Sequence, residues 1–131
     1  MASSGPAGRP LRTSAGTSFN HGDVSHNTIT SAKECLYLLG SVDNVNMHDN
    51  TLLGGTYGIR ADDGDCYMIT GNRIVCTTPI YFTHANVVRP MIFGNNWDGS
   101  TNDINVAAAT DERVASNIDK DGAWAWGDNV Q

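Results

Sequence analysis

The sequence predicts an all-β protein built as a short solenoid, in which short strands stack coil upon coil. Three observations predict this fold: a composition that disfavours helices, an asparagine motif at a constant interval, and an apolar triplet in phase with that motif. The 131 residues correspond to one domain of ordinary size. An antiparallel β-sandwich or jelly roll is the alternative, since it also has short strands at regular spacing.

The composition favours turns and strands over helices. The chain contains 14 Gly and 13 Asn, but only two Glu, two Lys and six Leu. Glu, Lys and Leu favour helix interiors, whereas Gly and Asn tolerate the left-handed backbone of tight turns. A helical bundle is therefore excluded.

The charge balance excludes two classes of partner. The formal net charge is −6, and the eight Lys and Arg residues are spread singly along the chain. Nucleic acids and anionic membrane surfaces bind basic patches, because neutralised phosphates supply much of the affinity. No apolar run approaches the length of a membrane span. We therefore expect neither nucleic acid nor membrane among the partners.

Residues 1–20 are expected to form an extended N-terminal arm, and residues 21–131 a β-solenoid domain. The arm is rich in Gly, Ser, Pro and Ala, with Leu11 and Phe19 as its large apolar side chains. Such a segment buries too little apolar surface to offset its own ordering entropy. We expect it to be held by the body of the chain or by a neighbouring subunit.

An asparagine motif defines the repeat. Each copy has an apolar residue three positions before the Asn and another two positions after it. Four copies span residues 24–29, 47–52, 69–74 and 92–97. A fifth copy at 114–118 has its last apolar residue one place early. The intervals are 23, 22, 23 and 22 residues, which indicates a solenoid of about five coils. The repeated residues are Asn27, Asn50, Asn72, Asn95 and Asn117.

An apolar-x-apolar triplet follows each motif and predicts a further strand in each coil. Period-two alternation places the outer two residues of a triplet on one face of a strand. The triplets are at 36–38, 59–61, 80–82, 104–106 and 124–126. Trp124 and Trp126, in the last triplet, are expected to form a C-terminal cap over the open end of the stack.

The repeated run of apolar-x-(Gly, Asp or His)-Asn-x-apolar resembles the coils of right-handed parallel β-helices, as in pectate-lyase-like proteins and bacteriophage tailspikes. The resemblance covers about residues 20–127 and concerns the fold alone. In that family a stacked asparagine ladder turns the chain between two sheets. We expect each Asn here to adopt the left-handed turn conformation and its amide to hydrogen-bond the Asn of the adjacent coil.

The densest polar stretch offers an alternative acidic site at Asp62, Asp63 and Asp65. Paired carboxylates act as acid and base in glycoside cleavage, and carboxylate oxygens ligate Ca²⁺. The stretch lacks the remaining ligands of a calcium loop, and Asp and Gly are common in turns. We therefore predict a solvated turn, with no catalytic residue, no metal and no cofactor.

The middle residue of each triplet faces outward, which brings Tyr37, Arg60 and Tyr81 together on one sheet face. Tyr and Arg are enriched at protein interfaces, and both also stack on sugar rings. Aromatic and long side chains also suit strand surfaces for structural reasons alone. The candidate interface consists of Leu11, Phe19, Tyr37, Arg60 and Tyr81.

These expectations lead to a non-enzymatic structural or assembly protein of a virion, assembled in the host cytoplasm. The closest description is a bacteriophage capsid decoration (cement) or tail-associated protein, because five coils span only about 24 Å. It would form homo-oligomers, such as trimers, and contact a capsid or tail protein through the arm and the outward face. The alternative is a carbohydrate-binding or polysaccharide-degrading β-helix fragment of the tailspike or pectate-lyase type, a glycoside hydrolase or a polysaccharide lyase.

Overall fold

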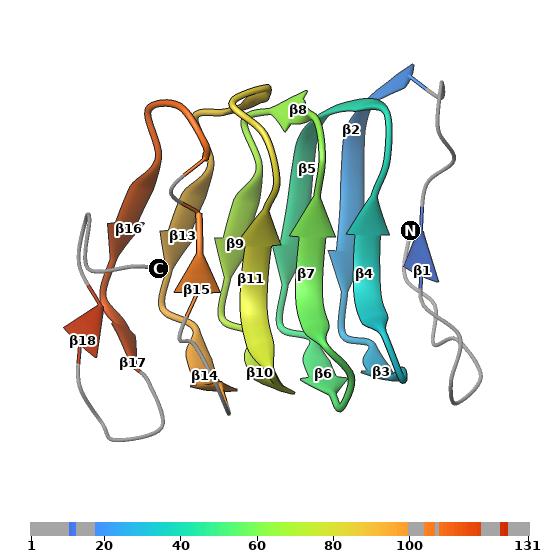
Figure 1. Ribbon diagram of the computed structural model, residues 1–131, viewed down its shortest axis with the longest axis vertical. Helices are drawn as coiled ribbons and strands as arrows, with labels where there is room; N and C mark the ends of the chain where they lie inside the picture. The colour runs from blue at the N-terminus through green and yellow to red at the C-terminus, as the bar shows by residue number, and fades with distance from the viewer. Residues whose placement is uncertain (1–10, 13–17, 100–103, 107, 119–123, 126–131) are drawn as a thin grey trace.

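The fold is a parallel β-solenoid. The computed structural model describes residues 11–12, 18–99, 104–106, 108–118 and 124–125, and these form strands and turns with no helix. The strands lie side by side and pair in parallel from coil to coil (Figure 1). There are about four turns, with coils about 23 residues apart. The predicted fold class is confirmed, and the antiparallel sandwich is wrong.

Three sheets run along the stack, and the chain passes through them in the order sheet B, sheet C, sheet A. Sheet B contains β2 (Ser18–Ser25), β5 (Ser41–His48), β9 (Met68–Thr70), β13 (Met91–Phe93) and β16 (Arg113–Ala115). Sheet C contains β3 (Thr28–Thr30), β6 (Thr51–Leu53), β10 (Arg73–Cys76), β14 (Asn96–Gly99), β17 (Asn117–Ile118) and β18 (Trp124–Ala125). Sheet A contains β1 (Leu11–Arg12), β4 (Glu34–Leu38), β7 (Tyr57–Ala61), β11 (Thr78–Phe82) and β15 (Ile104–Asn105).

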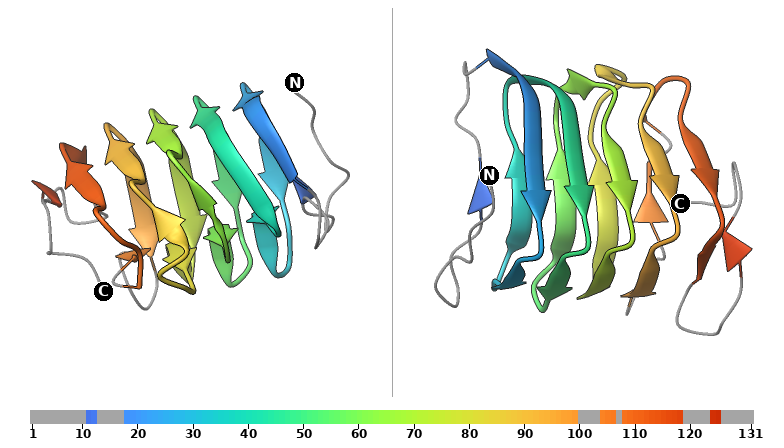
Figure 2. Two further views of the ribbon diagram at one scale, coloured as in Figure 1. Left: turned by 90° about the horizontal axis from the view of Figure 1, so that it is seen from above. Right: turned by 180° about the vertical axis from the view of Figure 1, so that it is seen from behind.

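Sheets A and B form opposite sides of the stack, and sheet C joins them along one edge. Figure 1 shows β4, β7 and β11 in front of sheet B, and the right-hand view of Figure 2 shows sheet B from its own side. A short parallel pair of β8 (Gly64–Asp65) and β12 (Val87–Val88) lies at the corner between successive coils. The outer faces of sheets A and B are therefore separate surfaces.

The core lies between the three sheets and is built from stacked apolar columns. Each residue of a column pairs in register with its equivalent in the next coil, so like side chains lie one above another. Burial of these columns is the main source of stability, since the hydrophobic effect scales with the apolar area removed from water. The sheet C column consists of Ile29, Leu52, Ile74 and Trp97, all 0 % exposed. The sheet B column consists of Val24, Met47, Ile69, Ile92 and Val114, all buried.

A buried asparagine ladder runs along the corner between sheets B and C. In each step the backbone N–H and the side-chain Nδ2 of one Asn donate to the Oδ1 of the next Asn, at 3.0 or 3.1 Å. From the second residue onward, each Nδ2 also donates to a backbone carbonyl of the preceding coil, at 2.8 or 2.9 Å. The ladder consists of Asn27, Asn50, Asn72, Asn95 and Asn117.

The left-handed turn conformation falls on the residue before each ladder asparagine, so its predicted position was wrong. The residues with positive φ are His26 (57°), Asp49 (55°), Gly71 (64°), Gly94 (63°) and Ser116 (58°). A second left-handed column precedes the first by five residues and consists of His21 (66°), Asn44 (54°), Cys66 (58°), Arg89 (50°) and Asp111 (56°). The first column bends the chain between sheets B and C and leaves the asparagine backbone free to bond along the stack. The second column lies inside β2 and β5 in the first two coils and just before β9, β13 and β16 in the later ones.

The described part of the predicted arm lies against the chain's own first two coils. Leu11 pairs with Leu36 of β4, and Phe19 pairs with Val42 of β5, both in parallel. β1 and β2 therefore continue sheets A and B by one strand each. The other predicted arm residues, 1–10 and 13–17, lie outside the described residues.

The fifth coil differs from the prediction. β16 and β17 continue sheets B and C, but β18 turns back and pairs antiparallel with β17, with Ile118 opposite Trp124. The expectation that the 124–126 triplet forms a strand equivalent to the other triplets, which lie in sheet A, is therefore wrong for Trp124 and Ala125. The shortened fifth motif supplies the reason, because Ile118 aligns with Asn96 rather than with the inward-facing Trp97. Trp126 lies outside the described residues.

Candidate functional site

The outer face of sheet A brings the predicted row together. Tyr37 on β4 pairs in register with Arg60 on β7, and Arg60 pairs with Tyr81 on β11. Asn105 on β15 continues the row. The neighbouring positions Leu36, Ile59 and Ile80 point into the core, so the row residues alternate to the outer side of the sheet. Tyr37 is nevertheless buried, at 9 % exposure, whereas Arg60 and Tyr81 are half-buried.

Arg60 is the centre of this face, which we call the Arg60 cluster: Glu34, Tyr37, Tyr57, Arg60, Asp62, Tyr81 and Thr83. The guanidinium carbon lies 4.6 Å from the ring centroid of Tyr37 and 5.7 Å from that of Tyr57, within the range of cation–π attraction. Nη1 donates to Glu34 Oε1 at 3.2 Å, and Nε donates to Asp62 Oδ1 at 3.4 Å. The Arg60 side chain is thus held in one orientation from four sides and is 24 % exposed.

Asp62 connects the arginine to both neighbouring strands. Its Oδ2 accepts from the Tyr37 hydroxyl at 2.7 Å, and its Oδ1 accepts from Thr83 Oγ1 at 2.8 Å. Although partial burial opposes the change, these hydrogen bonds and the Arg60 charge lower the pKa of Asp62. Burial raises the pKa of Tyr37, and its bond to the Asp62 carboxylate raises it further. At neutral pH the cluster therefore holds an ionised carboxylate and a neutral phenol.

Two cluster members, Glu34 and Tyr57, were not among the residues predicted from the sequence. Glu34 pairs in register with Tyr57, and each lies three residues before the row residue of its own strand. The Glu34 side chain is only 5 % exposed, and the Tyr57 ring stacks on Tyr81 with centroids 4.8 Å apart and planes 14° apart. Their sequence signal was the same 23-residue interval that identified Tyr37 and Arg60.

The three aspartates of the alternative acidic site have different partners, so no two of them form a catalytic pair. Asp62 belongs to the Arg60 cluster, whereas Asp63 Oδ1 accepts from the Gly64 backbone N–H at 2.8 Å within a turn. Asp65 forms an ion pair with Arg89, which lowers the pKa of its carboxyl. Each carboxylate already has its own partners, and in the described part of the chain no group of three His, Cys, Asp or Glu could hold a metal ion.

Histidines and aspartates of the first two coils gather beside β2 and β5, at the N-terminal end of the stack. His48 Nδ1 lies 2.7 Å from Asp49 Oδ2, and His48 Nε2 lies 3.2 Å from Asp23 Oδ2. The His26 ring packs edge-on against the His48 ring, with centroids 5.7 Å apart. Hydrogen bonds to Asp49 and Asp23 raise the pKa of His48. The contacts tie the first coil to the second, and the sequence showed no metal-ligand spacing that would have grouped these residues.

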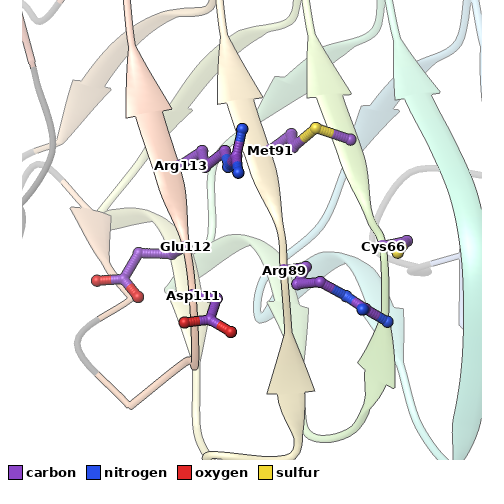
Figure 3. A pocket seen from close by; sticks show the side chains of 6 residues that line it. All are labelled: Cys66, Arg89, Met91, Asp111, Glu112 and Arg113. Carbon is purple, nitrogen blue, oxygen red and sulfur yellow. The ribbon is translucent and has the colours of Figure 1, made fainter.

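A hollow of about 510 Å³ lies beside β9, β13 and β16, toward the C-terminal end of the stack. Figure 3 shows its lining, in which Arg113 and Met91 lie close together while Glu112 points away from them. The hollow contains both signs of charge, and Arg89 is already paired with Asp65. Its lining consists of Cys66, Arg89, Met91, Asp111, Glu112 and Arg113. The mixture of Arg and carboxylate side chains favours no single charged ligand.

Comparisons of this chain with protein-family models, with curated proteins and with solved structures give no match. The resemblance to β-helix proteins therefore holds at the level of the parallel β-solenoid.

The remaining predicted residues are Leu11 and Phe19, whose backbones lie in β1 and β2 and whose side chains lie outside the described residues. Among the described residues, no helix is long and apolar enough to cross a membrane. Chemically, the Arg60 cluster offers two stacked aromatic rings and a held guanidinium on a flat parallel sheet. Such a surface can bind a partner by stacking and by hydrogen bonds, and it can do so with little loss of side-chain entropy.

Proposed function

We propose that this chain is a non-enzymatic structural protein that contacts other protein subunits through the Arg60 cluster on the outer face of sheet A. The observation that carries the proposal is the arrangement of Arg60 between Tyr37 and Tyr57, with Glu34 and Asp62 as its ion partners. Tyr and Arg dominate the binding energy of many interfaces, above all where they are held in place before binding.

The proposal extends to the assembly in which the protein functions. A virion component, such as a bacteriophage capsid decoration or tail-associated protein, needs a compact and rigid body with side chains presented on flat faces. The stack of about four turns and its acidic composition support such a role. Homo-oligomers and a capsid or tail protein are the proposed partners, with the virion as the location.

The experiment tests incorporation into particles. An antibody against the chain should detect it in virus particles purified by density gradient from the organism that carries the gene. A variant with Arg60→Ala and Tyr81→Ala should be incorporated poorly, whereas Arg73→Ala, at an exposed position of sheet C, should be incorporated normally. Detection of the wild-type chain only in particle-free fractions would overturn the virion assignment, and normal incorporation of the double variant would overturn the role of the Arg60 cluster.

Carbohydrate is the second candidate partner, and the stacked pair Tyr57 and Tyr81 favours it, because sugar rings bind to aromatic faces. A glycan array distinguishes the two candidates. Glycan binding that is lost in the double variant would replace the subunit partner with a carbohydrate, and release of reducing ends or unsaturated products would point to the enzyme alternative.

A further inference from the structure

The outer face of sheet B carries two rows of side chains that are distinct from the Arg60 cluster. Residues of these rows alternate with the buried column of sheet B, so their side chains point away from the core. Register pairing aligns them across all five strands. The first row consists of Asp23, Asn46, Met68, Met91 and Arg113. The second row consists of Ser25, His48, Thr70, Phe93 and Ala115.

The centre of this face is apolar and its two ends carry opposite charges. Met68 is 37 % exposed and is the only large apolar side chain in the described part of the chain that is exposed. Met91 and Phe93 on the next strand are half-buried, which extends the apolar patch. Asp23 lies at the β2 end and Arg113 at the β16 end, and both are exposed. Methionine adapts its shape to a partner surface, so the patch suits a protein contact.

The order of residues in the first row is complementary to itself under a two-fold rotation. An axis parallel to the strands and passing over β9 reverses the order of the coils in a second copy. Asp23 then faces Arg113 of the second copy, and Met68 faces Met68 of the second copy. In the second row, His48 faces Phe93 of the second copy. Without this reversal Asp23 would lie opposite Asp23 of the second copy, and the repulsion between the two like charges disfavours that arrangement.

We propose that the outer face of sheet B is the contact surface of a two-fold symmetric homodimer of this chain. The same patch on both subunits forms such an isologous contact, with an apolar centre and a charged rim. Sheet A, which carries the Arg60 cluster, lies on the opposite side of the stack from sheet B (Figure 2), so the dimer contact does not cover it. The dimer therefore uses a different surface from the Arg60 cluster contact of the proposed function, and failure of one contact leaves the other untouched.

The mass in solution tests the dimer. Sedimentation of the full chain over a series of concentrations should give twice the 14.0 kDa mass of one chain at the upper end. Met68→Asp places two carboxylates, one from each copy, at the centre of the contact and should leave a single-chain mass at every concentration. Circular dichroism checks that the variant is folded. A wild-type chain that stays at the single-chain mass, or that assembles as a trimer, overturns the proposal.

Charge reversal tests the two-fold arrangement itself. Each dimer contains the Asp23–Arg113 contact twice, so Arg113→Asp should raise the dissociation constant about tenfold. Combining it with Asp23→Arg should restore the wild-type dissociation constant, because both contacts are re-formed with opposite signs. Arg73→Asp, on sheet C, is the matched control and should have no effect. A double variant as weak as Arg113→Asp alone overturns the arrangement.

Cross-linking gives a second readout. Cys66 belongs to the left-handed column beside β9, so the axis would bring it close to Cys66 of the second copy (Figure 3). A short bismaleimide should join two chains through Cys66 in the wild type and not in Cys66→Ser. Cross-linking that persists unchanged in Met68→Asp would count against the sheet B contact.

Discussion

Replacing Asn72 by Ala removes a central step of the asparagine ladder. The side chain takes part in four buried hydrogen bonds: Nδ2 donates to Met47 O at 2.9 Å and to Asn95 Oδ1 at 3.0 Å, and Oδ1 accepts from the backbone N–H and Nδ2 of Asn50, both at 3.0 Å. A typical buried hydrogen bond contributes about 1 kcal/mol, so Asn72→Ala should lower the free energy of unfolding by about 4 kcal/mol.

Asn27→Ala is the matched comparison, because Asn27 occupies the end of the ladder. Within the part of the chain that the structure describes, its side chain makes two bonds, from Nδ2 to Ser25 O at 3.0 Å and to Asn50 Oδ1 at 3.1 Å. The backbone bond from Asn27 to Asn50 Oδ1 remains after substitution. The expected loss is therefore about 2 kcal/mol, half that of the central position.

Equilibrium unfolding in urea measures both losses. If Asn72→Ala lowers the free energy of unfolding no more than Asn27→Ala does, the stability of the ladder does not follow from the number of hydrogen bonds that each side chain makes. Asn72→Asp provides a further check, since burial and the facing oxygens of Met47 and Asn95 should raise the pKa of the new carboxyl above its unfolded value. The destabilisation should then be full at neutral pH and shrink as the pH falls through the raised pKa, where the neutral carboxyl can donate.

Three other predictions concern separate parts of the stack. The aspartate partners of His48 raise its pKa, so its contribution to stability should be full below about pH 6.5, the ordinary histidine pKa, and should be lost as the pH rises through the raised pKa. Urea unfolding at a series of pH values measures this dependence, and His48→Gln should flatten it. Gly58→Ala should lower the free energy of unfolding by about 2 kcal/mol or more, because a Cβ there would meet the Ile74 side chain and the Pro79 carbonyl oxygen. A Cβ at Gly94 meets nothing within 4 Å, so Gly94→Ala should cost only about 1 kcal/mol for its left-handed backbone. Equal losses of stability in thermal unfolding would contradict the packing argument. Trp97 is fully buried and its Nε1 has no partner among the described residues, so Trp97→Phe should cost less than about 2 kcal/mol, since the lost apolar area is offset by removal of an unpaired donor.

The repeat interval predicted most of the fold. In a parallel stack, residues one coil apart lie one above another, so a pattern in the sequence becomes a column in space. The interval between Asn27 and Asn50 located the ladder, and the triplets located the inward residues Leu36, Ile59 and Ile80, which pair in register. The same logic placed Tyr37, Arg60 and Tyr81 in one outward row.

The corners of the coils were less predictable. The sequence pointed to Asn27 as the left-handed residue, but the structure places the positive φ on His26, because the asparagine backbone N–H is needed for the ladder. The antiparallel pairing of Trp124 with Ile118 was also unexpected. Both features depend on how the backbone satisfies its hydrogen bonds at the turn or at the end of the stack, and no column pattern records that.

The sequence by itself therefore determined the solenoid, its interval and its inward and outward columns, because stacking reduces these features to a one-dimensional repeat. Only the tertiary structure decided which side chains of different columns meet. Glu34 reaches Arg60 over one coil, and Asp23 reaches His48 in the same way, since corner geometry and side-chain length bring together positions that do not share a register. The charge order of sheet B likewise becomes meaningful only when the five strands lie side by side on one face.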